Sequence, residues 1–270
     1  MAVNDVRSVL TALRLLDEVA ARQPVGVSEL ARALELPKSS VQRTLQTLHS
    51  AGWIQPIGVE VKRWGLTTHM LRIGQRAAGE LDLRNVAVPV MEELRSATQE
   101  TVHLAVPEQD NVIVIERLDS PQSVRTFIPL GMAAPIAASA NGKAILAART
   151  RDEVRDLLER GLSAYTPTTV TDAEALLAQL EEIRRRGYAT NEEEWREDVA
   201  AVAAAISAGG RPIAGISVST PAHRMTPELQ ARYGELLTEA AHRISVTLER
   251  PGVEQPRSSV VAPGDTGPRT

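Results

Sequence analysis

The stretch from position 25 to position 65 constrains the fold of this chain most, because its apolar residues keep a helical spacing that is interrupted at definite points. Leu30 and Leu34 fall on one side of a first helix, which Ser28 is expected to cap through its hydroxyl. Pro37 cannot continue that helix, but it suits the first position of the next one, where a missing N–H costs nothing. The pattern predicts two short helices joined by a tight turn.

The predicted second helix has a buried stripe and an outer side without acidic residues. Val41, Leu45 and Leu48 repeat at helical spacing, whereas no Asp or Glu occurs between positions 36 and 59. Side chains of Lys, Arg, Ser, Thr and Gln donate to phosphate oxygens, and Arg and Gln also reach base edges in the major groove. We interpret this side as a candidate DNA-contact face. Its residues are Lys38, Ser39, Ser40, Gln42, Arg43, Gln46 and Thr47.

Two apolar runs, at positions 53–57 and 59–66, follow the helix pair and are separated by Gly58. They predict two strands around a turn. Lys62 and Arg63 fall where such a wing would meet the DNA backbone. The helix pair alone is equally compatible with a packed helical hairpin that has a polar exterior, and the basic wing favours a winged helix-turn-helix DNA-binding unit.

The charge is distributed unevenly along the chain, whose formal net charge is −4. Residues 1–67 contain eight Lys or Arg and six Asp or Glu, while the remaining residues contain 22 basic and 28 acidic side chains. Only the N-terminal part has the sign that attracts phosphate. Because the excess is small, tight binding is expected to need two copies of this unit on one duplex.

Composition excludes several other classes of protein. The absence of cysteine rules out disulfides, cysteine-ligated zinc and iron–sulfur clusters. The five histidines are scattered without metal-ligand spacing, so neither a metal site nor a cofactor is predicted. No apolar run reaches the length of about 18 residues that a membrane helix needs, and the N-terminus is polar. We therefore expect a cytoplasmic protein with no membrane partner.

The rest of the chain predicts an α+β order of elements, with short β-branched runs between helices and a final stretch rich in Pro and Gly that is expected to be disordered. Pro89 is expected to kink a helix or to mark a fresh start. The predicted helices span 6–23, 67–81, 83–98, 140–148, 151–160, 172–186 and 226–249, and the predicted strands are the runs TVHLAV, VIVIERL and VRTFIPL, then 199–206 and 212–219.

Six motifs occur in order along the chain: LPKSSVQRTLQTL, IERLDSPQSVR, ASANGKAILA, YTPTTVTD, RRRGYATNEEE and GISVSTPAHR. With these motifs the chain closely resembles the IclR family of bacterial transcriptional regulators, from about Val6 to Leu248. The resemblance implies a winged helix-turn-helix domain at residues 1–67, a linker helix at 68–82, a GAF-like α/β domain with a mainly antiparallel sheet at 83–250, and a tail at 251–270. It also implies dimers, often paired into tetramers, that bind palindromic double-stranded operator DNA.

The resemblance further implies an effector pocket in the C-terminal domain. In the family this pocket is lined by amides of the loop that here reads ASANG, by an acidic residue after the GY pair, by a cysteine ten residues on, and by two serines of a later strand. Asn191 stands in place of the acid and carries no charge, and Ala201 replaces the thiol and leaves apolar room. A small organic effector with at least one oxygen acceptor is therefore expected. The corresponding residues here are Ala140, Asn141, Asn191, Ala201, Ser217 and Ser219.

Structural roles remain open for the same residues. Serine hydroxyls on a strand often bond neighbouring backbone, Asn191 could hold a turn, and Gly142 could serve only a close approach of helix and sheet. Lys143 after Gly142 suggests a phosphate loop, but Ala144 replaces the hydroxyl that would hold magnesium, and ATP binding is rejected.

Two other functions remain as alternatives at this point. A hydrolase could use Ser217 or Ser219 with His223, although the chain has no G-x-S-x-G elbow and a non-enzymatic function is preferred. A sensor domain without a small ligand could instead act through protein contacts.

Overall fold

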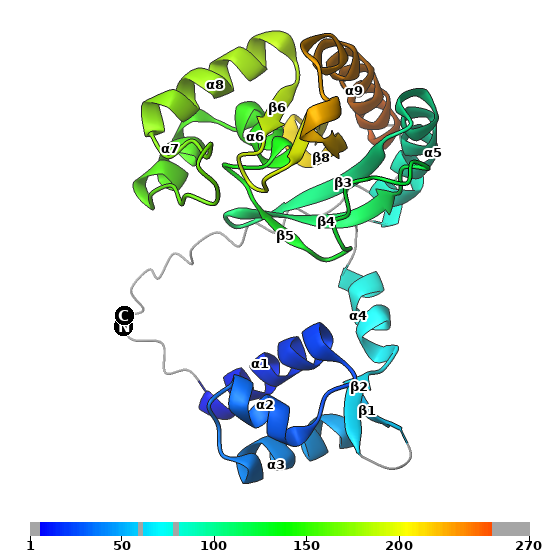
Figure 1. The fold of residues 1–270 in the computed structure, drawn as a ribbon, viewed down its shortest axis with the longest axis vertical. Helices are drawn as coiled ribbons and strands as arrows, with labels where there is room; N and C mark the ends of the chain where they lie inside the picture. Colours follow the sequence, from blue (N-terminus) through cyan, green and yellow to red (C-terminus); the bar gives the residue numbers. More distant parts are fainter. Residues whose placement is uncertain (1–5, 59–61, 78–80, 250–270) are drawn as a thin grey trace, which may run out of the picture. The chain divides into compact units, whose positions relative to one another are not determined.

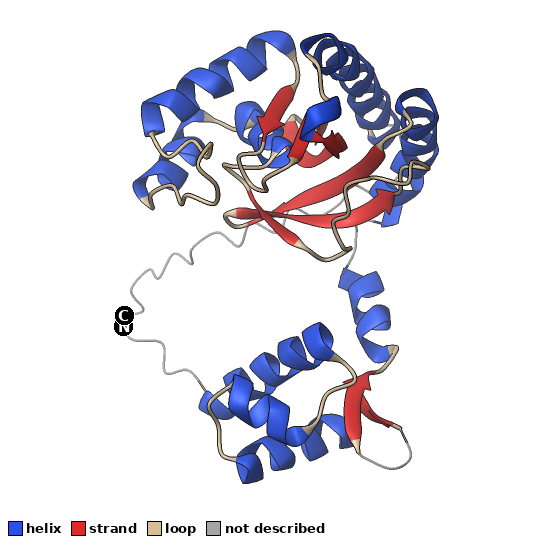
Figure 2. Cartoon of the chain, in the orientation of Figure 1, coloured by secondary structure: helices blue, strands red, loops and turns tan. Residues whose placement is uncertain are grey.

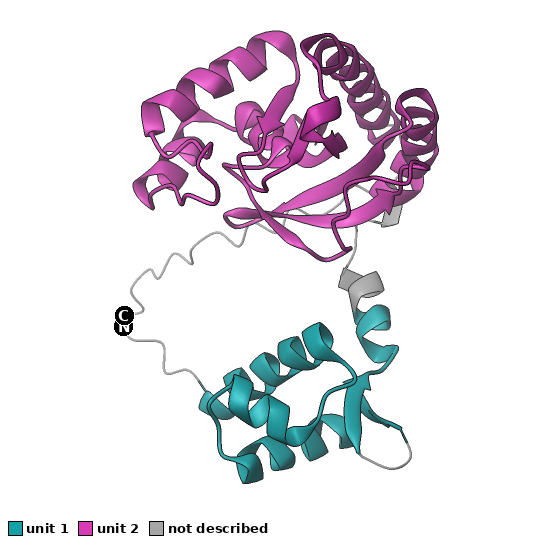
Figure 3. Ribbon diagram, in the orientation of Figure 1, with its two compact units in different colours: residues 1–78 teal, residues 79–270 magenta. Residues whose placement is uncertain are grey.

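The computed structural model describes residues 6–58, 62–77 and 81–249, and the chain divides into two compact units, residues 1–78 and 79–270 (Figure 3). Helices and strands alternate in the α+β order predicted from the sequence (Figure 2). The tail predicted at 251–270 lies outside the described residues.

The first unit is a winged helix-turn-helix, as the sequence predicts. Its core is formed by apolar residues from the first three helices and from the wing, among them the fully buried Leu15, Leu30 and Leu45. Its elements are α1 (Arg7–Arg22), α2 (Val27–Ala33), α3 (Lys38–Ser50), β1 (Ile54–Ile57), β2 (Arg63–Leu66) and α4 (His69–Ala77), which are labelled in Figure 1.

The start of α2 differs from the prediction. Ser28 does not cap the helix, because Gly26 is the residue that precedes its first turn. The side chain of Glu29 accepts a bond from the Gly26 N–H at 3.5 Å, and this local acceptor replaces the predicted serine cap. α3 follows the prediction more closely, with Pro37 at the position just before the helix.

The wing is fixed to the body of the unit by backbone bonds. Trp64 and Val25 exchange two N–H···O bonds of 2.8 and 3.1 Å. The side-chain oxygen of Gln23 accepts the Leu66 N–H at 2.8 Å. A Cβ added at Gly65 would lie 2.2 Å from the end of the exposed Ile57 side chain, which would have to move to make room. The two strands therefore form a defined wing next to α2 and α3.

The second unit is built on one six-stranded sheet in the order β5-β4-β3-β8-β7-β6, with every neighbouring pair antiparallel. Helices cover both faces of this sheet (Figure 1). The strands are β3 (Thr101–Glu108), β4 (Asn111–Leu118), β5 (Ala133–Pro135), β6 (Ala189–Glu192), β7 (Val199–Ala208) and β8 (Arg211–Pro221). The helices are α5 (Leu81–Thr98), α6 (Ala140–Ala148), α7 (Arg151–Glu159), α8 (Ala173–Arg186) and α9 (Pro227–Leu248), with a short 3-10 turn at Ala222–Arg224.

Two separate cores follow from the alternation of side chains along the strands. Ile216 and Val218 of β8 pack with α5 and α9 on one face. Ser217 and Ser219 point to the other face, which α6, α7 and α8 cover. The polar members of β8 thus lie beneath α6, in a buried layer.

Two predicted elements take another form. The run VRTFIPL is not a strand: the Thr126 hydroxyl donates to the Ser219 carbonyl and the Thr126 carbonyl accepts from the Thr101 hydroxyl, both at 3.2 Å. The segment at 133–135 pairs with β4 instead. Pro89 lies inside α5, which continues past it, so of the two predicted alternatives the fresh start is wrong and the kink stays a prediction.

Candidate functional sites

The outer side of α3 is exposed as the helical spacing predicts. Val41, Leu45 and Leu48 are buried in the core, which turns the polar residues between them to solvent. Neither Lys38 nor Arg43 has an ion-pair partner among the described residues, so both charges are available to phosphate. The exposed members of the face are Lys38, Ser39, Gln42, Arg43, Gln46 and Thr47, and Ser40 is half-buried.

The two basic residues of the wing have different surroundings. The Lys62 ammonium lies 4.7 Å from the centroid of the Trp64 ring. Arg63 donates to the Pro24 carbonyl at 2.9 Å and to the Glu29 carboxylate at 2.9 Å. The structure gives Arg63 a role in joining the wing to α2, while its contact with DNA stays a prediction.

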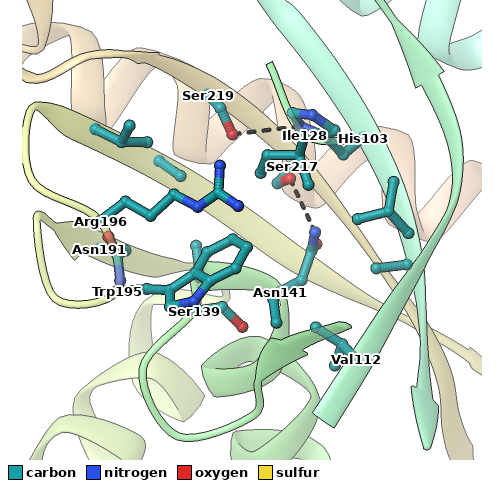
Figure 4. A pocket seen from close by; sticks show the side chains of 16 residues that line it. His103, Val112, Ile128, Ser139, Asn141, Asn191, Trp195, Arg196, Ser217 and Ser219 are labelled. Atoms are coloured by element: carbon teal, nitrogen blue, oxygen red, sulfur yellow. Dashed lines mark hydrogen bonds between the residues drawn. The ribbon is translucent and has the colours of Figure 1, made fainter. Parts of the chain in front are cut away.

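A pocket lies between α6 and the sheet in the second unit (Figure 4). The strand register places Asn191 of β6 beside Ala201 of β7, and Ala201 beside Ser219 of β8. Ser217 lies two residues before Ser219 on the same face, facing Asn141 of α6. Together with Ala140, all six residues predicted to bind an effector line this one pocket.

The first turn of α6 forms one wall of the pocket. The Ser139 hydroxyl accepts the Gly142 N–H at 3.2 Å, and the Asn141 carboxamide donates to the Ser217 hydroxyl at 2.9 Å. The amides of Ala140 and Asn141 have no acceptor within the described part of the chain, as expected at a helix start. Gly142 permits the tight turn, because a Cβ there would lie 2.1 Å from the Ile136 carbonyl oxygen.

Asn191 lies at the pocket and also has a structural partner there, while its contact with an effector stays a prediction. Its side chain lines the pocket, and its carboxamide nitrogen donates to the Ala138 carbonyl in the loop before α6. A carboxylate could not make this bond, since it has no hydrogen to donate. The amide at this position therefore holds the loop in place without adding charge to the pocket.

His103 is a pocket residue that the sequence did not reveal. It lies on β3 opposite Ser217, and its Nδ1 is 3.4 Å from the Ser219 hydroxyl. Burial, with a smaller contribution from the Arg117 charge and an opposing one from Asp119, lowers the pKa of His103 to about 4. The ring is neutral near pH 7, so it supplies one donor and one acceptor beside Ser219. Only the pairing of β3 with β8 brings His103 to Ser219, and this register cannot be read from the sequence of β3 alone.

Residues 193–198, here called the pocket loop, carry two further lining residues, Trp195 and Arg196. Hydroxyls of the YTPTTVTD motif hold the start of this loop. Thr166 donates to the Glu193 carbonyl at 2.7 Å, and Thr169 donates to the Glu194 carbonyl at 2.6 Å. The motif at 165–172 thus fixes a segment of the pocket wall far from it in sequence.

A buried ion pair joins the pocket loop to α6. Lys143 of α6 is buried and binds the Glu194 carboxylate, and its ammonium also donates to the Gln179 side chain at 3.3 Å. Burial lowers the pKa of Lys143, while the Glu194 charge opposes that shift. The ammonium is committed to this pair, and Lys143 is not among the lining residues of the pocket.

The serine–histidine pair considered for a hydrolase is not formed. His223 lies in the exposed turn at Ala222–Arg224 and does not line the pocket. The imidazole beside Ser219 belongs to His103, and a base whose pKa is about 4 removes a hydroxyl proton poorly near neutral pH. In the part of the chain that the structure describes, no cluster of three potential metal ligands occurs, and no helix has the length and hydropathy to cross a membrane.

A winged helix-turn-helix with a free basic face, joined in one chain to an α+β domain that encloses a small pocket, defines a ligand-responsive DNA-binding regulator. Two family models match the chain: that for the IclR helix-turn-helix domain over residues 8–57, and that for the C-terminal part of bacterial transcriptional regulators of the IclR type over residues 75–246. The chain belongs to the IclR family of transcriptional regulators.

Individual relatives agree with this assignment over nearly the whole chain. The regulator KdgR of Escherichia coli K12 is 34% identical over 247 residues, which cover 91% of this chain and 94% of that protein. The transcriptional repressor IclR of the same organism is 31% identical over 250 residues, 91% of each chain. The protein is accordingly a DNA-binding transcriptional regulator with a C-terminal effector-binding domain.

Solved structures show the same architecture. The IclR protein of Thermotoga maritima is 28% identical, matches with a TM-score of 0.76, and covers 91% of this chain and 100% of its own. An IclR homologue from Microbacterium hydrocarbonoxydans, solved in complex with 4-hydroxybenzoate, is 27% identical with a TM-score of 0.77, and the match covers 89% of this chain and 98% of that one.

Proposed function

We propose that this regulator contacts operator DNA through the outer face of α3 and that a small organic effector bound in the pocket controls this contact. Arg43 and Gln42 lie midway along the exposed face and are assigned to base edges in the major groove, while Lys38 and the wing residue Lys62 are assigned to phosphates. The remaining hydroxyl and amide groups of the face position the helix.

The observation that carries the effector assignment is the convergence of six residues from separate segments on one pocket. Asn191, Ala201 and Ser219 come into one row only through the register of three strands, and α6 adds Ala140 and Asn141 to them. The polar groups of the pocket suit a small molecule with oxygen atoms that can meet Ser217, Ser219 and the free amides of α6. The 4-hydroxybenzoate bound to the Microbacterium homologue is of this kind.

A dimer is the proposed working form. Val9, Leu10 and Leu13 of α1 are exposed on one side of the helix, at 53%, 45% and 53%, although the other side of α1 is buried. Such an apolar stripe is covered when two copies pair, and two heads then reach successive major grooves of a palindromic site. We further propose that these dimers can pair, that the protein represses its operator as the relatives named repressors do, and that it acts in the cytoplasm, where its DNA lies.

Separate measurements of DNA and effector binding test this proposal. Ser219→Ala should leave the affinity for a fragment of the chain's own promoter unchanged and should blunt the response to any metabolite that shifts the melting temperature. Ser123→Ala, on an exposed loop residue, serves as the control. Loss of both activities in Ser219→Ala would indicate misfolding, which circular dichroism detects.

Two results would overturn the assignment of the pocket. If no metabolite shifts the melting temperature while the protein still binds its promoter, control by a small effector fails and a sensor domain that acts through protein contacts replaces it. If purified protein cleaves an ester or amide, the enzyme alternative returns.

A further inference from the structure

The pocket carries one permanent charge, and that charge is positive. Its sixteen lining residues include Arg196 and no Asp or Glu. His103 is neutral near pH 7. The pocket loop contains four acids, none of which lines the pocket. Glu194 binds Lys143, Glu193 accepts the Asp198 N–H at 2.8 Å, and Glu197 and Asp198 are exposed to solvent. An unpaired cation in a partly enclosed site attracts an anion.

Arg196 is held in position without a carboxylate partner. Its guanidinium lies 4.5 Å from the centroid of the Trp195 ring, and no acceptor within the described ranges binds it. In Figure 4 the side chain extends from the pocket loop into the pocket, toward the side where Ser217 and Ser219 lie. Stacking on an indole orients the guanidinium and leaves its N–H groups free at the edge.

The segment that presents Arg196 is held by contacts within the protein. Thr166 and Thr169 hold its backbone, and the buried Lys143–Glu194 pair holds the side chain two positions earlier. A site whose loop is already ordered loses less conformational entropy on binding. The guanidinium of Arg196 therefore has a defined position in the pocket wall.

We infer that Arg196 determines the specificity of the pocket by binding the carboxylate of the effector in a two-pronged pair, with a second oxygen of the effector at Ser217, Ser219 and His103. The inference rests on the proposed function of the pocket and adds the class of ligand: an organic acid whose anionic end lies on the pocket loop. Asn191 is consistent with this, since an acid at that position would oppose the anion.

The test uses matched pairs of small organic acids and their neutral amides, among them 4-hydroxybenzoate and 4-hydroxybenzamide, screened by melting temperature and followed by titration calorimetry. For wild-type protein, acids should bind and their amides should bind much more weakly. Arg196→Gln should weaken acid binding about 10- to 100-fold and leave amide binding nearly unchanged, since hydrogen bonds to charged groups are the strong ones. Arg196→Lys should retain part of the affinity. Arg155→Gln, an exposed residue of α7, is the charge-matched control.

The possible outcomes separate this inference from the function on which it rests. Acids that bind equally well to Arg196→Gln would overturn the inference alone and place the anion at the free amides of α6. Amides that bind as tightly as acids would also overturn it. If no member of the panel binds while promoter binding persists, control by a small effector fails and the inference with it. A purely structural role of Arg196 would change the affinities for acids and amides by the same factor, which contradicts the inference.

Discussion

The DNA-contact face and the pocket organise their polar residues in opposite ways. The face is one stretch of α3 whose side chains are exposed and make few contacts with the rest of the unit. The pocket is assembled from all six strands of the sheet, α6 and loop residues, and most of its polar side chains are buried and hydrogen-bonded within the domain. Changes on the face should therefore alter binding with little effect on folding, whereas changes around the pocket should alter both.

The largest effect is expected where the pocket wall depends on a buried charge pair. Lys143→Met removes the cation and leaves the Glu194 carboxylate buried without its partner. We expect the free energy of unfolding of the second unit to fall by about 3–5 kcal/mol, measured by urea denaturation. The double variant Lys143→Met with Glu194→Leu removes both charges and should recover most of this loss.

The double variant also decides what the pair is for. If it is as unstable as Lys143→Met, the loss comes from packing and not from the charge. If stability returns but acids no longer bind, the pair serves to position the pocket loop, in keeping with the place of Glu194 two residues before Arg196.

The next largest effect is a pH dependence of the unfolding free energy of the second unit, which arises from the buried His103. The pKa of His103 is lowered by burial from an ordinary value of 6.5 to about 4. Between these values the unfolded chain binds a proton that the folded chain does not, so the stabilising contribution of neutral His103 is complete above pH 6.5 and is lost as pH falls toward 4. The loss should approach about 3 kcal/mol. Urea unfolding measured across this range checks it.

The control for the pH effect is a histidine at the surface. His103→Gln should flatten the pH dependence of unfolding of the second unit, and His242→Gln, at an exposed position of α9, should leave it as in wild type. An unaltered pH dependence in His103→Gln would show that other groups carry the acid sensitivity.

The DNA-contact face could be predicted from the sequence and the pocket could not, because the face is local in the chain and the pocket is not. The helical spacing of Val41, Leu45 and Leu48 is local, and it fixed the outer face of α3 correctly. The row of Asn191, Ala201 and Ser219 depends on pairing between distant strands, so only the family resemblance brought these residues together.

His103 and Arg196 were missed for a physical reason. Both faces of the sheet are covered by helices, so alternation along β3 does not mark one side as polar and exposed. Arg196 sits on a loop whose position depends on distant threonines. The strand predicted at 124–130 is wrong for a related reason. Its β-branched residues suit a strand, but residues 133–135 occupy the edge of β4 with which it could have paired.

On the DNA-contact face, Arg43→Ala should weaken specific binding by about 1–3 kcal/mol if Arg43 reads a base, with an unfolding free energy close to that of wild type. Fluorescence anisotropy with the promoter fragment and with a scrambled fragment measures the two affinities. Arg32→Ala, an exposed arginine of α2, is the control. An equal loss on both fragments would assign Arg43 to phosphate, and no loss would remove it from the contact.

The smallest effect should come from the ion pair of the wing, which is the exposed counterpart of the pair beneath the pocket. The side chains of Arg63 and Glu29 remain 39% and 46% exposed, whereas those of Lys143 and Glu194 are 2% and 10% exposed. Water screens the exposed pair, so Arg63→Ala should lower the unfolding free energy by at most about 1 kcal/mol. The Arg63 guanidinium is already bound to Glu29 and to the Pro24 carbonyl, so its loss should change the salt dependence of DNA binding little. In Lys62→Ala, one phosphate contact is lost, which should reduce the slope of log K against log salt concentration by about 1. Equal slopes for the two variants would show that Arg63 leaves Glu29 to reach the DNA, and the wing would then contribute two phosphate contacts in place of one.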